Sequence, residues 1–161
     1  MAQESDSAEC ETSSGGQVRF DLQTFLPYLI RVFYADVTTS LSQIYLRDHQ
    51  LTPSEWRTMA ILGLNGQLPA AEIVDRSSMD KVSVSRAVKK MHERGLLQKT
   101  DNADDGRSSL LSLSKTGSAV YSDLVPKVLG VEARMVEGLT SQEVSAFLGT
   151  MERIRDNLRT L

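Results

Sequence analysis

The chain has 161 residues, is 40% apolar and carries a formal net charge of −3, which is typical of a single globular domain. Its one cysteine, Cys10, excludes an intramolecular disulfide, and His49 and His92 have no metal-ligand spacing, so we expect neither a metal nor a cofactor. No apolar run approaches the roughly 20 residues of a membrane-spanning helix, and the N-terminus lacks a signal pattern, so we expect a cytoplasmic protein without a membrane partner.

The opening segment, MAQESDSAECETSSGG, is small, acidic and polar and has no apolar periodicity. Such a segment buries too little apolar surface to offset the entropy of ordering. We therefore predict a disordered acidic tail over residues 1–16 and one domain over residues 17–161. Cys10 lies in this tail, well before the first predicted helix, which disfavours a redox-sensing role for it and leaves that role as an alternative.

Residues 21–47 are predicted to form one long amphipathic helix, in which Pro27 is tolerated near the first turn. Its apolar residues recur at helical spacing: Leu26, Ile30, Phe33, Val37, Leu41 and Ile44. This stripe is expected to face the protein core.

A second stripe of the same helix has mixed chemistry: Arg31, Tyr34, Thr38, Leu41 and Tyr45. It fits one wall of a pocket for an aromatic ligand with an anionic end, which Arg31 would pair with. Trp56 and Met59 on the next helix would form another wall. In the alternative interpretation, the two tyrosines pack at a dimer interface and Arg31 is solvated.

The next two predicted helices are short. Thr52 and Glu55 form a Thr-x-x-Glu capping box around Pro53, and Gly63 and Gly66 mark the end of that helix. A helix over residues 68–78 is expected to turn Ala70, Ile73 and Val74 inward. Ser77, Ser78 and Met79 then form a turn, and Asp80 is the predicted N-cap of the following helix.

That following helix, within MDKVSVSRAVKKMHERGLL, has an apolar face and an opposite basic face. The apolar face collects Val84, Ala87, Val88 and Met91, and the opposite face presents Val82, Arg86, Lys89, Lys90 and Glu93, flanked by Ser83 and Ser85 and preceded by Lys81. Residues 76–115 hold nine Lys and Arg against five acidic residues, a local charge of +4. The net negative charge of the chain therefore hides one basic segment.

A short helix, a tight turn and a helix with a basic, hydroxyl-rich first half suit insertion into the DNA major groove. We expect Arg86 to pair with a guanine and Val82 to contact a thymine methyl group. Ser83 and Ser85 are expected to bond to bases or phosphates, and the expected phosphate contacts are Lys81, Lys89 and Lys90. The alternative is an ordinary amphipathic helix with a solvated charged face.

A β-hairpin is predicted over LLQKTDNADDGRSSLLSLS, because apolar and polar residues alternate on both sides of a turn-rich insert. Arg107 follows the insert, where an arginine can enter the minor groove, and Asp105 is the candidate for bracing it. A solvent-exposed charged turn would have the same composition. This hairpin is the only β-structure predicted.

Two helices are predicted between residues 117 and 161, with a bend near Pro126 and a second capping box at Thr140 and Glu143. The last helix repeats apolar residues at helical spacing: Leu139, Val144, Phe147, Leu148, Met151, Ile154 and Leu158. These helices and residues 21–47 have more apolar surface than the short helices and the hairpin between them can cover, so we expect dimerisation through both chain ends. Packing within one chain is the alternative.

The stretches LTPSEWRTMAILG, DKVSVSRAVKKMHERGLL and DNADDGRSSLLSLSKTG together resemble the MarR family of winged helix-turn-helix regulators over about residues 21–161. The resemblance implies a mainly α fold with a small β-hairpin, a DNA-binding part over about residues 52–115, and dimerisation helices over about 21–47 and 117–161. It also implies an obligate homodimer, usually a repressor, that binds double-stranded DNA at a palindromic operator and is released by a ligand. The sequences of the first predicted helix and of the basic stretch MDKVSVSRAV resemble those of regulators of aromatic-acid degradation. This resemblance implies an aromatic acid or its coenzyme A thioester as effector.

Other function classes fit the sequence less well. The sequence has no Gly-rich phosphate loop, no Gly-x-Ser-x-Gly motif and no histidine with an obvious nucleophile partner, so we do not expect an enzyme. A winged helix that binds proteins without DNA is a further alternative.

Overall fold

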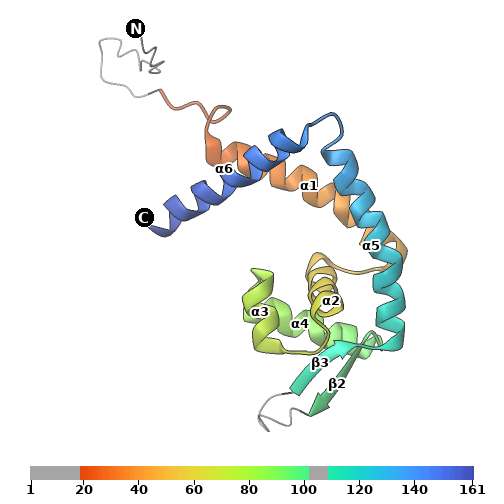
Figure 1. The fold of residues 1–161 in the computed structure, drawn as a ribbon. Helices are drawn as coiled ribbons and strands as arrows, with labels where there is room; N and C mark the ends of the chain where they lie inside the picture. Colours follow the sequence, from red (N-terminus) through yellow and green to blue (C-terminus); the bar gives the residue numbers. More distant parts are fainter. Residues whose placement is uncertain (1–18, 102–108) are drawn as a thin grey trace. The chain divides into compact units, whose positions relative to one another are not determined.

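The computed structural model describes residues 19–101 and 109–161. The elements, all but β1 labelled in Figure 1, are α1 (Leu26–His49), α2 (Pro53–Asn65), β1 (Leu68–Pro69), α3 (Ala70–Ser77), α4 (Lys81–Glu93), β2 (Leu97–Asp101), β3 (Ser109–Leu113), α5 (Lys115–Met135) and α6 (Ser141–Arg159). The mainly helical fold with a β-hairpin after a helix-turn-helix is confirmed. Among the helices that the structure describes, none combines the length and the apolar composition of a transmembrane span.

The chain divides into two compact units after Ala35. In the first unit, α1 begins at Leu26, five residues later than predicted. Pro27 explains the difference, because a proline inside a longer helix would clash with the carbonyl group four residues before it, on Gln23. The preceding residues form a turn instead, in which the Asp21 carboxylate accepts a hydrogen bond from the Gln23 N–H at 2.9 Å.

The apolar stripe predicted for the first half of α1 is not buried in a single chain. Leu26, Ile30 and Phe33 are 52%, 48% and 50% exposed. The prediction that these three residues face the core is therefore wrong for one chain. Leu41 and Ile44, in the second unit, do pack against the core.

The core of the second unit is built around α2 and α4. Its fully buried side chains include Leu51, Met59, Leu62, Ile73, Val84, Met91 and Leu124. The predicted inner face of α4 is confirmed, since Val84, Ala87 and Met91 are buried and Val88 packs partly against the same cluster. One narrow apolar stripe thus sets which face of α4 points to the core.

The sheet has a third strand that the sequence did not predict. β1 pairs with β3 in an antiparallel register of Leu68 with Leu111 and Pro69 with Leu110, which gives the strand order β1-β3-β2. A strand of two residues carries no alternation to detect, and Pro69 is tolerated because β1 is an edge strand. The β2–β3 hairpin follows the prediction, with Leu97 opposite Leu113.

Two details of the predicted short helices are wrong. α3 starts at Ala70, which is exposed rather than turned inward, because the two residues before it belong to β1. Gly63 lies inside α2, and Gly66, with a φ of 78°, ends the helix alone. The capping boxes at Thr52 and Thr140 are both confirmed.

The last two helices carry much exposed apolar surface. α5 continues through Pro126, and α6 follows it from its cap at Thr140. Along the segment that includes α6, the exposed apolar residues are Leu139, Phe147, Leu148, Met151 and Leu158. Apolar surface of this kind is typical of a chain that buries it against a partner.

Gly117 and Gly130 in α5 give a direct test of the packing. A Cβ atom on Gly117 would lie inside the contact distance of the Leu96 carbonyl oxygen, whereas a Cβ atom on Gly130 would meet nothing within 4 Å. We expect Gly117→Ala to lower the free energy of unfolding by about 2 kcal/mol through overpacking. Gly130→Ala is the control and is expected to raise it by about 0.5–1 kcal/mol through helix propensity. Urea unfolding followed by circular dichroism measures both, and equal effects would contradict the packing.

Candidate nucleic-acid interface

Helix α4 begins at a well-defined cap. Asp80 adopts an extended conformation, and its Oδ1 accepts a hydrogen bond from the Ser83 N–H at 2.8 Å. The Ser83 hydroxyl donates a second hydrogen bond to Asp80 Oδ2 at 2.6 Å. The preceding Ser78 has a φ of 53°, a left-handed conformation that turns the chain between α3 and α4. The predicted N-cap is confirmed, and the turn begins at Ser78, because Ser77 is the last residue of α3.

The two faces of α4 differ as the periodicity predicted. Val84 and Met91 are 1% and 0% exposed, whereas Val82 is 57% exposed. The other outward residues are also exposed: Lys81, Ser85, Arg86, Lys89, Lys90 and Glu93. Ser83 is half-buried. The structure therefore presents the predicted DNA-contact residues of α4 on an accessible surface, while their contacts with DNA stay predictions.

A hollow between the start of α2 and α4 brings hydroxyl and basic groups together. It encloses about 450 Å³ and is lined by Thr52, Ser54, Glu55, Ser83, Arg86, Ala87, Lys89, Lys90 and Glu93. Arginine, lysine and hydroxyl groups are the side chains that bind phosphate oxygens. Glu93 lies at 3.9 Å from Lys89 and offsets part of the positive charge. Thr52 and Ser54 were not among the predicted contacts, since nothing in the sequence places the start of α2 beside α4.

Lys99 is a second residue that the sequence analysis missed. It lies on β2, pairs in register with Leu111, and is exposed. Together with Ser85, Lys89 and His92 it lines a hollow of about 440 Å³ between α4 and the sheet. The alternation of apolar and polar residues in this strand predicts that Lys99 points to solvent. That the strand lies beside α4 does not follow from the sequence.

The hydrogen bonds at the cap define the electrostatics of this end of the helix. The hydroxyl and backbone N–H groups of Ser83 stabilise the ionised carboxylate and hold the pKa of Asp80 below its ordinary value of 3.8. Because the Ser83 hydroxyl proton is donated to Asp80, its oxygen is left as an acceptor for any further partner.

The residues proposed for the ligand pocket lie in different surroundings. Tyr45 is 3% exposed and stacks on Trp56 at a ring distance of 6.0 Å, and Trp56 stacks on Tyr121 at 6.4 Å. Met59 is fully buried. These three side chains of the predicted pocket, Tyr45, Trp56 and Met59, thus contribute to core packing, and their contact with a ligand stays a prediction.

The remaining predicted ligand residues are less enclosed. Arg31, in the first unit, places its guanidinium carbon 5.8 Å from the ring centre of Tyr28. Tyr34 is exposed and Thr38 is half-buried. Asp105, Arg107 and Cys10 lie outside the described residues, so their predicted roles are untested. Within residues 19–101 and 109–161, no group of three or more metal-ligating side chains is present.

The cap predicts a specific pH dependence. Since the pKa of Asp80 is lowered in the folded protein, its ionised form stabilises folding at pH values above 3.8, and this contribution is lost as the pH falls through the lowered pKa. We expect Ser83→Ala to raise the pKa of Asp80, as followed by carboxyl ¹³C NMR. The pKa of Glu143, which is lowered by Thr140 in the other capping box, is the internal control and must not move. An unchanged pKa of Asp80 would contradict the hydrogen bond from the Ser83 hydroxyl, since the backbone N–H of residue 83 is kept in this variant.

Comparisons with known proteins agree with this arrangement. The sequence model of the MarR family matches residues 49–108. The transcriptional repressor NicR of Pseudomonas putida is 22% identical over 138 residues, which cover 86% of this chain and 87% of NicR.

Solved structures show the same fold. A MarR/EmrR family regulator from Acinetobacter sp. ADP1 matches with a TM-score of 0.78 and 19% identity over 88% of this chain and all of that chain. Bordetella bronchiseptica BpsR, whose DNA binding is regulated by 6-hydroxynicotinic acid, matches with a TM-score of 0.77 and 20% identity over 86% of this chain and 99% of BpsR.

Proposed function

We propose that this chain, a member of the MarR family of winged helix-turn-helix transcriptional regulators, is a homodimeric repressor. A small aromatic ligand would release it from a palindromic operator. The observation that supports this most is the division of α4 into a buried apolar stripe and an exposed basic face. DNA binding itself follows from family membership.

Residues of α4 divide by chemistry into two groups. Arg86 can bond bidentately to a guanine, and the exposed Val82 fits the methyl group of a thymine. Ser83, whose hydroxyl proton is held by Asp80, would accept a hydrogen bond from the amino group of an adenine or a cytosine. Ser85 is a further base or phosphate contact. These side chains are proposed to determine the operator sequence.

The lysines would supply binding that does not depend on sequence. Lys81, Lys89 and Lys90 are proposed to contact phosphates, with Lys99 as an addition from the sheet. Arg107 would enter the minor groove, braced by Asp105. The hydroxyl groups at the start of α2 fit the same phosphate track.

Dimerisation is supported by the exposed apolar surface of each chain end. In a family dimer that binds a palindrome, the two α4 helices must lie about one DNA turn apart, ~34 Å. A ligand that prefers a different spacing would release the protein, because it shifts the equilibrium by its differential affinity for the two states.

The effector class is proposed from the predicted pocket and from the relatives. BpsR responds to 6-hydroxynicotinic acid, an aromatic acid. The proposed contacts are Arg31, Tyr34, Thr38, Tyr45, Trp56 and Met59. Since Tyr45 and Met59 are core residues, a ligand that reached them would have to displace core packing. Such a displacement would link binding to a change in conformation.

Two substitutions separate sequence reading from phosphate binding. We expect Arg86→Ala to cost ~1–3 kcal/mol on the operator and to relax the preference at one base position. Lys89→Ala is expected to weaken binding to all sequences alike and to lower the slope of log affinity against log salt by about 1. Anisotropy titrations on promoter and scrambled DNA measure both effects. Identical behaviour of the two variants would contradict the assigned roles.

The function as a whole is tested by titrating the purified protein onto its own promoter fragment at several salt concentrations. The aromatic probes are 6-hydroxynicotinate, p-coumarate, ferulate and the coenzyme A thioesters of the last two. Specific binding that one probe abolishes is the expected result. Specific binding that no probe changes would overturn the effector class, and absence of specific binding would favour a protein-interaction module.

A further inference from the structure

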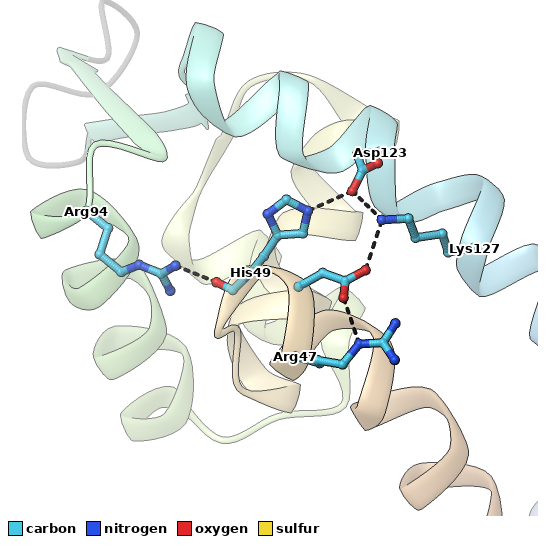
Figure 2. A network of polar contacts seen from close by, with 6 residues as sticks. Arg47, His49, Arg94, Asp123 and Lys127 are labelled. Carbon is cyan, nitrogen blue, oxygen red and sulfur yellow. Dashed lines mark hydrogen bonds and ion pairs between the residues drawn. The ribbon is translucent and has the colours of Figure 1, made fainter.

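Arg94, directly after α4, forms hydrogen bonds with the C-terminal end of α1, which is far away in sequence. Arg94 is the C-cap of α4. Its Nη2 donates a hydrogen bond to the carbonyl oxygen of His49 at 2.6 Å, and its Nη1 donates to that of Gln50 at 3.2 Å. The final carbonyl groups of a helix have no partner within it, so the guanidinium satisfies the end of α1 (Figure 2).

A buried carboxylate forms an ion pair with the same guanidinium. The Glu55 side chain is 3% exposed, and its Oε2 accepts the Thr52 N–H at 2.8 Å in the α2 capping box. Arg94 Nη1 lies 3.8 Å from that oxygen. The planar fork of an arginine can face two carbonyls and a carboxylate at once, whereas a lysine ammonium is a point charge.

The residues that Arg94 contacts, at the end of α1, are held in place by their own neighbours. Gln50 has a φ of 51°, a left-handed conformation that a non-glycine residue keeps only where its surroundings hold it. The Leu51 N–H donates to the Tyr45 carbonyl at 2.9 Å, and the Leu51 side chain is fully buried. Arg94 therefore contacts a fixed point at the end of α1.

A cluster of charges ties the same end of α1 to α5. Lys127 donates to Asp48 at 2.9 Å and to Asp123 at 2.7 Å. His49 Nε2 lies 2.8 Å from Asp123 Oδ2, and Arg47 Nε lies 2.9 Å from Asp48 Oδ1. Figure 2 shows these groups as one chain of contacts.

The carboxylates of this cluster are held in their ionised form. The Lys127 ammonium, followed by Arg47, lowers the pKa of Asp48 from 3.8 to about 2. Lys127 and then His49 lower the pKa of Asp123, and the two carboxylates raise the pKa of Lys127. Asp48, Asp123 and Lys127 thus stay charged at neutral pH.

The contacts of Arg94 and those of the charged cluster meet at His49. The carbonyl oxygen of His49 accepts from Arg94, and the imidazole of His49 contacts Asp123. We propose that Arg94 is a positioning residue that fixes recognition helix α4 to the junction of α1 and α5, so that the spacing of the two α4 helices in the dimer follows those helices. This inference rests on the proposed reading of DNA by α4.

The contacts predict an effect on spacing rather than on base recognition. Arg94 lies beyond the first half of α4, which holds the proposed base contacts, so its removal leaves those side chains in place. It loosens the hold on the end of α4, so the two α4 helices of a dimer would sample a wider range of separations. Two half-sites are then engaged together less often, while one half-site is bound as before.

The test compares Arg94→Ala and Arg94→Lys with Arg19→Ala, a control that removes an exposed arginine before α1, outside the segments proposed for DNA binding and dimerisation. Affinity is measured for a single half-site, for the full promoter site, and for sites with the spacer changed by about one or two base pairs. For Arg94→Ala we expect half-site affinity within about twofold of wild type, a loss of about tenfold on the full site and a flattened spacing profile. Arg94→Lys is expected to lie between, and the control to match wild type.

Thermal unfolding accompanies each variant, and Arg94→Lys carries the test if Arg94→Ala does not fold. A half-site loss equal to the full-site loss, or a spacing optimum as sharp as that of wild type, would overturn the positioning role. Wild-type protein without specific binding would instead overturn the proposed function, and this inference with it.

Discussion

The arrangement of the proposed DNA-binding surface depends on the burial of one narrow apolar stripe of α4. Val84, Ala87 and Met91 are buried, and a helix that buries only these positions must turn the residues opposite them to solvent. Four of the residues opposite are charged, and the fifth is the exposed Val82. The Asp80 cap fixes where the helix begins and therefore which residues form its first turn. The burial of this one stripe therefore both packs the core and turns the basic face of α4 to solvent.

The junction of α1, α2, α4 and α5 gives this surface a defined connection to the rest of the chain. Arg94 joins α4 to the end of α1 and to the buried Glu55, and Lys127 and His49 join α1 to α5. These hydrogen bonds and ion pairs are directional. Apolar packing alone would allow sliding, whereas a forked hydrogen bond specifies one position. The junction is therefore suited to transmit a change in the helices at the chain ends to α4.

Local sequence signals predicted what depends on local chemistry. Both capping boxes, the Asp80 cap, the two faces of α4 and the hairpin strands follow from residues a few positions apart. The two-residue strand β1 was missed because it is formed by pairing with β3, far along the chain. Tyr45 was assigned to a ligand stripe, yet tertiary packing places it against Trp56 in the core. The grip of Arg94 on His49 joins residues 45 positions apart, which no local pattern reports.

Dimethyl sulfate footprinting tests directly whether α4 of each subunit enters the major groove of the protein's own promoter, because the reagent methylates guanine N7 in the major groove and adenine N3 in the minor groove. We predict two clusters of protected guanines about one helical turn apart, roughly 10 base pairs, on the promoter fragment. Guanines that stay fully reactive under saturating protein, with protection confined to adenine N3, would contradict it.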